Sequence, residues 1–159
     1  MIDIGVIGEN SQHKVNNLCS ATEFYLNLLL DEDIINDLTI DIEIDPELNL
    51  SGECYPMEED PNPRHFVIRL NPETSSESIY ATLAHELVHV KQFATGEMYD
   101  YISFDGQKLQ VVKSWKGKTW EPEENQCSYY DSPWEIEAFG REVGMYHKWK
   151  NRKAIISGD

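Results

Sequence analysis

Basic residues are scarce in this chain. Lys and Arg number 13 against 29 Asp and Glu over 159 residues, which gives a formal net charge of −16 at pH 7. A surface of this sign repels phosphate, so the composition argues against a protein that binds nucleic acid or an anionic membrane. Because 40% of the residues are hydrophobic, the chain can bury a core and is not a disordered acidic tail. We therefore expect neither nucleic acid nor a membrane among its partners.

Cysteines and long apolar segments are also few. The three cysteines, Cys19, Cys54 and Cys127, are far apart and form no Cys-x-x-Cys pair, which is typical of free thiols in a reducing compartment. No apolar run is long enough to span a bilayer. The N-terminus lacks the basic region followed by an apolar one that marks a signal peptide. We expect a cytoplasmic protein whose residues 1–159 form a single domain.

Hydrophobic periodicity in the first half of the chain predicts both helix and strand. Apolar residues recur at helical spacing over residues 15–30. Strict alternation over residues 38–45 predicts a half-buried strand, and a shorter alternation over residues 66–70 predicts a second one. Residues 45–63, which contain four of the seven prolines, are predicted to form a long loop that lies over a cleft.

Helix-start and turn signals organise the second half. A capping box at residues 74–77 predicts a helix that runs to about Ala94 and stops at Gly96. Asp105-Gly106, between two alternating runs, predicts a β-hairpin. A second capping box at residues 132–135, with proline in the first helical position, predicts a final helix that reaches roughly Lys150. The sequence therefore predicts an α+β fold and not a regular βαβ alternation.

The second predicted helix carries the segment His85-Glu86-Leu87-Val88-His89. Residues four apart lie on one helix face, one turn apart along the axis, so both imidazoles can bind one tetrahedral zinc ion. Glu86 projects to the side, where its carboxylate can contact a metal-bound water without binding the metal, as in His-Glu-x-x-His metallohydrolases. The alternative, two solvent-facing histidines, is disfavoured by the apolar neighbours Leu83 and Val90.

A zinc ion needs a third protein ligand, which two histidines do not supply. The downstream candidates are Cys127, Asp131, Glu135, Glu137, Glu142 and His147. Glu135 occupies the third position of the capping box, where its carboxylate is expected to accept a hydrogen bond from the amide of Ser132. Glu142 is expected to point away from Glu137.

Glu137 is the predicted third ligand. It shares its helix face with Gly140 and Gly144, whose small size would let the metal-binding helix approach closely. The alternative is a surface carboxylate paired with Arg141 one turn later. A separate apolar stripe on the same helix is predicted to face the core; it consists of Ile136, Phe139 and Val143.

His85-Glu86-x-x-His89 followed by Glu137-Ala138 on a later helix resembles the zincin metallopeptidases of the gluzincin type. Residues 80–96 and 132–144 are similar to small uncharacterised metallopeptidases of bacteria and phages. The resemblance implies two helices that hold a zinc ion beneath a small twisted sheet whose edge strand lines the cleft. It implies His85, His89 and Glu137 as metal ligands and Glu86 as the catalytic base. Gluzincins often place an acidic residue one turn after the third ligand; Arg141 stands there, so another group, such as a backbone carbonyl, must orient the histidines.

The predicted activity is zinc-dependent hydrolysis of a peptide or protein substrate, with Glu86 as general base. The donor that stabilises the oxyanion stays open among Tyr129, Tyr130 and Tyr146. A substrate peptide could add to the strand at residues 65–70 if that strand is a sheet edge; otherwise the strand is interior. Two other functions compete: an acidic decoy that binds basic protein surfaces, and a structural zinc domain without turnover.

Overall fold

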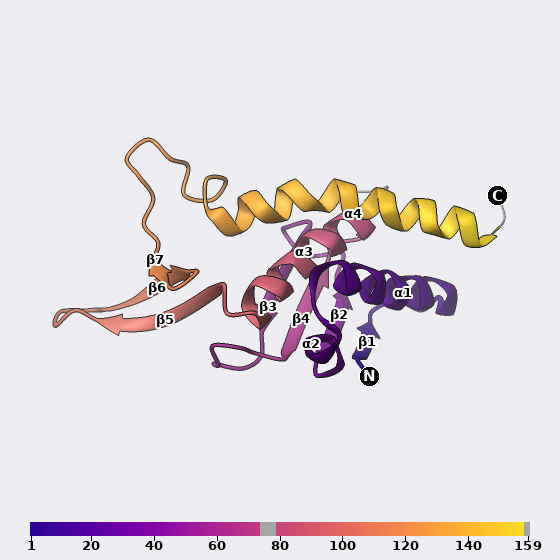
Figure 1. The fold of residues 1–159 in the computed structure, drawn as a ribbon, viewed down its shortest axis with the longest axis horizontal. Helices are drawn as coiled ribbons and strands as arrows, with labels where there is room; N and C mark the ends of the chain where they lie inside the picture. The colour runs from indigo at the N-terminus through magenta and orange to yellow at the C-terminus, as the bar shows by residue number, and fades with distance from the viewer. Residues whose placement is uncertain (74–78, 158–159) are drawn as a thin grey trace.

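A computed structural model describes residues 1–73 and 79–157, in which helices and two β-sheets form a mixed α+β arrangement (Figure 1). This confirms the fold class expected from hydrophobic periodicity. The capping box expected at residues 74–77 lies outside the described residues. The elements in chain order are β1 (Asp3–Ile7), α1 (Gln12–Leu29), α2 (Glu32–Asn36), β2 (Thr39–Ile44), β3 (Gly52–Pro56), β4 (His65–Leu70), α3 (Ile79–Ala94), β5 (Met98–Phe104), β6 (Leu109–Trp115), β7 (Lys118–Thr119) and α4 (Pro133–Ser157).

The larger sheet has the strand order β1-β2-β4-β3. β1, β2 and β4 are parallel, and β3 runs antiparallel to β4. β4 is therefore interior, and the idea that it forms the sheet edge is wrong. The edge strand beside β4 is β3, which lies inside the segment that the sequence predicts as a long loop. Like β1, β3 is thus one of two edge strands of this sheet. Its residues, Gly-Glu-Cys-Tyr-Pro, lack the aliphatic alternation by which strands are recognised.

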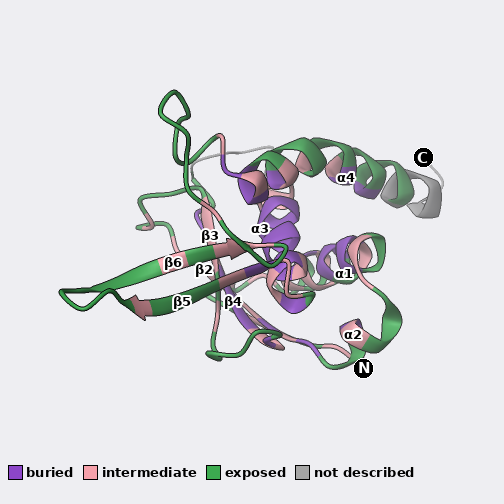
Figure 2. Ribbon diagram, turned by 60° about the vertical axis from the view of Figure 1, so that its left-hand side comes forward, coloured by how far each residue is buried: buried purple, intermediate pink, exposed green. Residues whose placement is uncertain are grey.

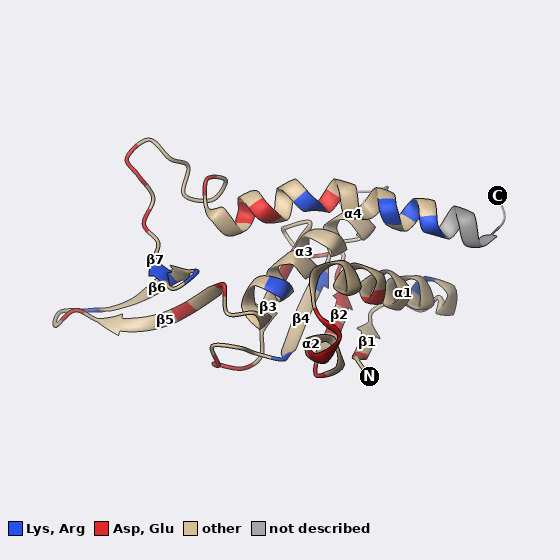
Figure 3. Cartoon of the chain, in the orientation of Figure 1, with Lys and Arg blue, Asp and Glu red and all other residues tan. Residues whose placement is uncertain are grey.

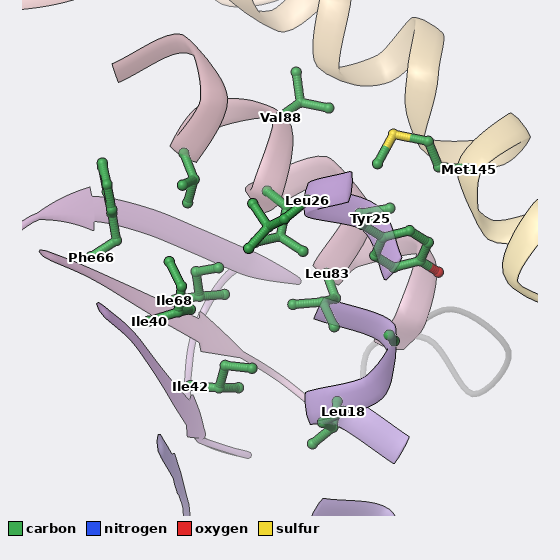
Figure 4. Close-up of a cluster of buried hydrophobic side chains, with 14 of the residues drawn as sticks. Leu18, Tyr25, Leu26, Ile40, Ile42, Phe66, Ile68, Leu83, Val88 and Met145 are labelled. Atoms are coloured by element: carbon green, nitrogen blue, oxygen red, sulfur yellow. The ribbon is translucent and has the colours of Figure 1, made fainter. Parts of the chain in front are cut away.

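One face of the larger sheet is covered by α1 and α3, and the core lies between these helices and the sheet (Figure 4). Ile40 and Ile42 of β2 point into this core, as the alternation of that strand predicts. The opposite face carries the charged residues of the same strands, where Arg69 pairs with Asp45 and with Glu53. Figure 2 shows α3 as the most deeply buried helix, since the sheet, α1 and α4 surround it.

α4 packs on α3 through a stripe that differs from the predicted one. The buried residues of α4 include Trp134, Ala138, Met145 and Trp149, which recur at helical spacing. Ile136, Phe139 and Val143, the predicted core stripe, are 41–57% exposed, so that prediction is wrong. The helix carries two apolar stripes, and either one could pack on the core. The sequence alone does not indicate which of them is buried.

The smaller sheet consists of the β5–β6 hairpin and β7 (Figure 1). The turn predicted at Asp105-Gly106 is confirmed: Gly106 has a positive φ of 91°, and the Asp105 carboxylate accepts hydrogen bonds from the amides of Gln107 and Lys108. At the base of the hairpin Trp115 packs on Trp134 of α4, whereas the tip extends away from the rest of the molecule.

Charge is unevenly distributed over these elements. Figure 3 shows acidic residues gathered around α2 and β2 and basic residues along the second half of α4. This matches the sequence, in which 13 acidic residues and no basic one lie between Lys14 and Arg64. Among the helices of residues 1–73 and 79–157, none has the length and apolarity that a membrane crossing requires.

Candidate metal centre

Three buried side chains from α3 and α4 converge at the contact between these helices. The Nε2 atom of His85 lies 3.1 Å from Glu135 Oε2, and the Nε2 atom of His89 lies 3.1 Å from Glu135 Oε1. One donor atom from each of the three residues lies within 4.8 Å of the others, and all three residues are buried. His85, His89 and Glu135 therefore form a group that could hold a metal ion.

The predicted third ligand, Glu137, is not brought to the histidines. Its carboxylate binds Lys91 Nζ at 3.0 Å, Gln92 Nε2 at 3.0 Å and Arg141 at 3.2 Å. Burial raises the pKa of Glu137, but the hydrogen bonds from Gln92 and Lys91 outweigh this effect and lower the pKa. The ion pair with Arg141, which was the alternative reading of Glu137, is present. The structure thus replaces Glu137 by Glu135 as the carboxylate of the group.

Glu135 is not identifiable from the sequence as the third carboxylate, because a glutamate at this position can either cap the helix or reach the histidines. In a capping box its carboxylate would return to the amide of Ser132. Instead, the Ser132 amide and hydroxyl both donate to the carbonyl of Tyr129, and the Glu135 side chain extends to the histidines. The sequence did contain one signal: Glu135 and Glu142 are two helical turns apart and therefore lie on the same helix face. In the structure both carboxylates reach His85.

Each histidine is oriented through its second ring nitrogen. His85 Nδ1 donates to Glu142 Oε2 at 2.8 Å, and His89 Nδ1 donates to Gln92 Oε1 at 2.8 Å. The Gln92 amide nitrogen donates to the Trp134 carbonyl, which holds the amide oxygen toward His89. Side chains, and not the backbone carbonyl anticipated from the sequence, therefore orient both rings. Partners of this kind fix ring orientation in protein metal sites and leave the Nε2 atoms free to bind.

The electrostatics of the group favour a cation. Burial lowers the pKa of His85, but the hydrogen bonds with Glu135 and Glu142 outweigh it and raise the pKa to about 9. Burial raises the pKa of Glu135, but its hydrogen bonds with both histidines lower the pKa to about 2. Carboxylate charge in a buried place is stabilised by positive charge, whether carried by imidazolium or by a metal ion.

The donor set fits zinc. Two imidazole nitrogens and one carboxylate are usual zinc ligands, at distances of about 2.0–2.2 Å. In the structure each imidazole meets a different oxygen of the Glu135 carboxylate at 3.1 Å, so all three donors face one position. Among the described residues three donors converge, and in zinc sites with three protein ligands the fourth position is open to water.

Glu86 lies beside this group without belonging to it. Its side chain is buried, and burial raises its pKa to about 7 against the opposing effect of His89 and His85. Glu86 and His85 line one cavity of about 430 Å³, together with Tyr129 and Tyr130. Tyr146, the third tyrosine considered as an oxyanion donor, packs against the core instead.

The edge strand β3 lines two cavities next to the metal group, one at each end of the strand. Its first residue, Gly52, lines the cavity that contains Glu86, and its last residues line a second cavity of about 240 Å³ that contains His89 and Glu135. A Cβ atom on Gly52 would lie 2.6 Å from the methyl group of Thr82 and 3.1 Å from Glu86 Oε1. Glycine therefore permits the close approach of β3 to α3 beside Glu86.

Replacing Glu142 by Ala is expected to weaken zinc affinity by about 10–100-fold, because His85 loses the acceptor that orients its ring. Glu142→Gln keeps an acceptor oxygen and should weaken affinity less. Competition with a chromophoric chelator measures both variants. Wild-type affinity in Glu142→Ala would show that the ring needs no such partner.

Comparisons with known proteins add no family to this description. No model of a protein family matches the chain, and no curated protein or solved structure shows significant similarity to it.

Proposed function

We propose that the protein is a zinc-dependent peptidase of the zincin type, with His85, His89 and Glu135 as metal ligands and Glu86 as general base. The observation that carries the proposal is the position of Glu86. Its carboxylate shares a cavity with a metal-binding histidine and is not itself one of the three converging donors. A structural zinc site has no use for such a carboxylate, whereas metal-dependent hydrolysis requires one.

The mechanism assigns a task to each residue. A zinc ion held by the three ligands would lower the pKa of a water molecule and polarise the scissile carbonyl. Glu86 would accept the proton of the attacking water at its carboxylate and deliver it to the leaving amine. Glu142 and Gln92 hold the two imidazoles in place while the proton moves.

A peptide substrate would bind along β3. One side of this strand pairs with β4, and the other is the edge of the sheet. An extended peptide can add to such an edge through its backbone, while its side chains enter the flanking cavities. β3 passes the metal group with one cavity on each side, so a peptide paired with it would cross the metal centre.

The experiment that tests the proposal is hydrolysis of an unfolded protein by the purified chain, with metal content measured in the same sample. We expect about one zinc ion per chain and hydrolysis that falls at least about 100-fold after chelation. Adding zinc back should restore the rate. Equal hydrolysis by the metal-free protein, or a pure protein that neither contains nor takes up zinc, would contradict the proposal.

A further inference from the structure

A third cavity, of about 640 Å³, adjoins the cavity that contains His89 and Glu135. One wall is the loop of residues 57–60 that follows β3, and the other is the β5–β6 hairpin. This cavity shares Pro56, Phe93 and Asp100 with the cavity that contains His89 and Glu135. A polypeptide bound along β3 could therefore continue past the metal centre into the space beside the hairpin.

The walls of this third cavity are acidic. Glu58, Glu59 and Asp60 stand on the loop and Asp100 on the hairpin, and the described residues that line the cavity include no Lys or Arg. Glu58 and Asp60 accept hydrogen bonds from backbone amides, and neither forms an ion pair within the part of the chain that the structure describes. Asp100 has Lys113 at 4.0 Å, a distance that gives little neutralisation at an exposed site.

The hairpin adds an apolar surface next to these carboxylates. Ile102 lies opposite Val111, and Phe104 lies opposite Leu109, so the four side chains share one face of the ribbon. They are 66–71% exposed, and Ile102 and Val111 line the third cavity. Figure 2 shows most of the β5–β6 hairpin as exposed. Large apolar side chains gathered on a projecting ribbon are typical of an interaction surface.

We propose that the hairpin face and the 57–60 loop form an exosite, a binding surface for a substrate segment that lies outside the cleaved bond. The segment would carry a Lys or Arg side chain for the carboxylates and neighbouring aliphatic or aromatic side chains for the apolar face. Continuity with the metal-centred cleft identifies the occupant as substrate, and complementary charge identifies its basic character. The inference rests on the proposed peptidase function, which it extends to substrate class.

The test is affinity selection of a randomised peptide library on immobilised Glu86→Gln protein, a readout that needs no turnover. We expect selected peptides to be enriched in Lys or Arg next to apolar residues. Substituting Glu58→Gln, Glu59→Gln and Asp60→Asn together should reduce the basic enrichment by about 10-fold or more, and Ile102→Ser with Val111→Ser should reduce the apolar one. The matched control neutralises Glu121, Glu123 and Glu124, which line none of the three cavities, and should change neither.

Cleavage of the same library by the zinc-loaded wild-type protein separates the two hypotheses. Two results would overturn the exosite while leaving the peptidase proposal intact. In the first, the library is cleaved but the selected peptides show no enrichment in basic or apolar residues. In the second, the library is cleaved and this enrichment persists in the exosite variants. A dimer that Ile102→Ser with Val111→Ser dissociates, without change in peptide selection, would assign the face to a second copy and also overturn it. No cleavage of any library peptide would overturn both.

Discussion

Peptide hydrolysis should fall by about 100- to 10,000-fold when Glu86 is replaced by Gln, while one zinc ion stays bound. The carboxylate is outside the three donors that converge on the metal position, so its loss removes no ligand. Gln has nearly the same shape but cannot accept a proton at neutral pH. Initial rates on an unfolded protein substrate and the zinc content of the same sample provide the measurement.

Glu142→Gln is the matched control, because it makes the same chemical change at the carboxylate that bonds His85 Nδ1. It should act through zinc affinity, so that saturating zinc restores most of its rate. Glu86→Gln should not respond to added zinc. Unchanged hydrolysis in Glu86→Gln would remove the general base from the mechanism and the enzyme proposal with it.

The same variant separates the peptidase from its two competitors. A structural zinc domain would show no hydrolysis in the wild-type protein, so Glu86→Gln would have nothing to remove. An acidic decoy would form a salt-sensitive complex with a basic protein, and that complex would survive the substitution. Loss of turnover with zinc retained is expected of the peptidase alone among the three.

Zinc affinity should distinguish the two carboxylates at the start of α4. Glu135→Gln is expected to weaken zinc binding by at least about 100-fold, since a neutral amide replaces a charged ligand, a larger loss than outer partners cause. Glu137→Gln should leave affinity within a few-fold of wild type, because that side chain pairs with Lys91, Gln92 and Arg141. Chelator competition on both variants provides the comparison.

These two substitutions are matched, since each exchanges one carboxylate for an amide in the first two turns of the same helix. Thermal unfolding of the metal-free proteins reports any general effect of losing the Glu137 ion pairs. Strong zinc binding by Glu135→Gln together with weak binding by Glu137→Gln would reinstate the ligand predicted from sequence. The convergence of Glu135 with both Nε2 atoms argues for the opposite result.

The parts of the fold that were predictable depend on residues close together in the chain. Apolar spacing predicts α3 and its end near Ala94, and Asp105-Gly106 predicts the hairpin turn. The edge strand was not predictable, because Gly52–Pro56 has no alternation and pairs as a strand only through the backbone of β4. Which apolar stripe of α4 is buried likewise depends on how that helix lies against α3.

By itself, the sequence determined the acidic character of the protein, its α+β class and the pair of histidines on one helix face, because net charge, periodicity and helical spacing are local properties. Only the tertiary structure decided the third carboxylate. Glu135 and Glu137 both stand near the start of α4, and which of them meets the histidines depends on the rotation of α4 against α3. That rotation is set by the burial of Trp134, Ala138 and Met145, a packing outcome that no short stretch of sequence contains.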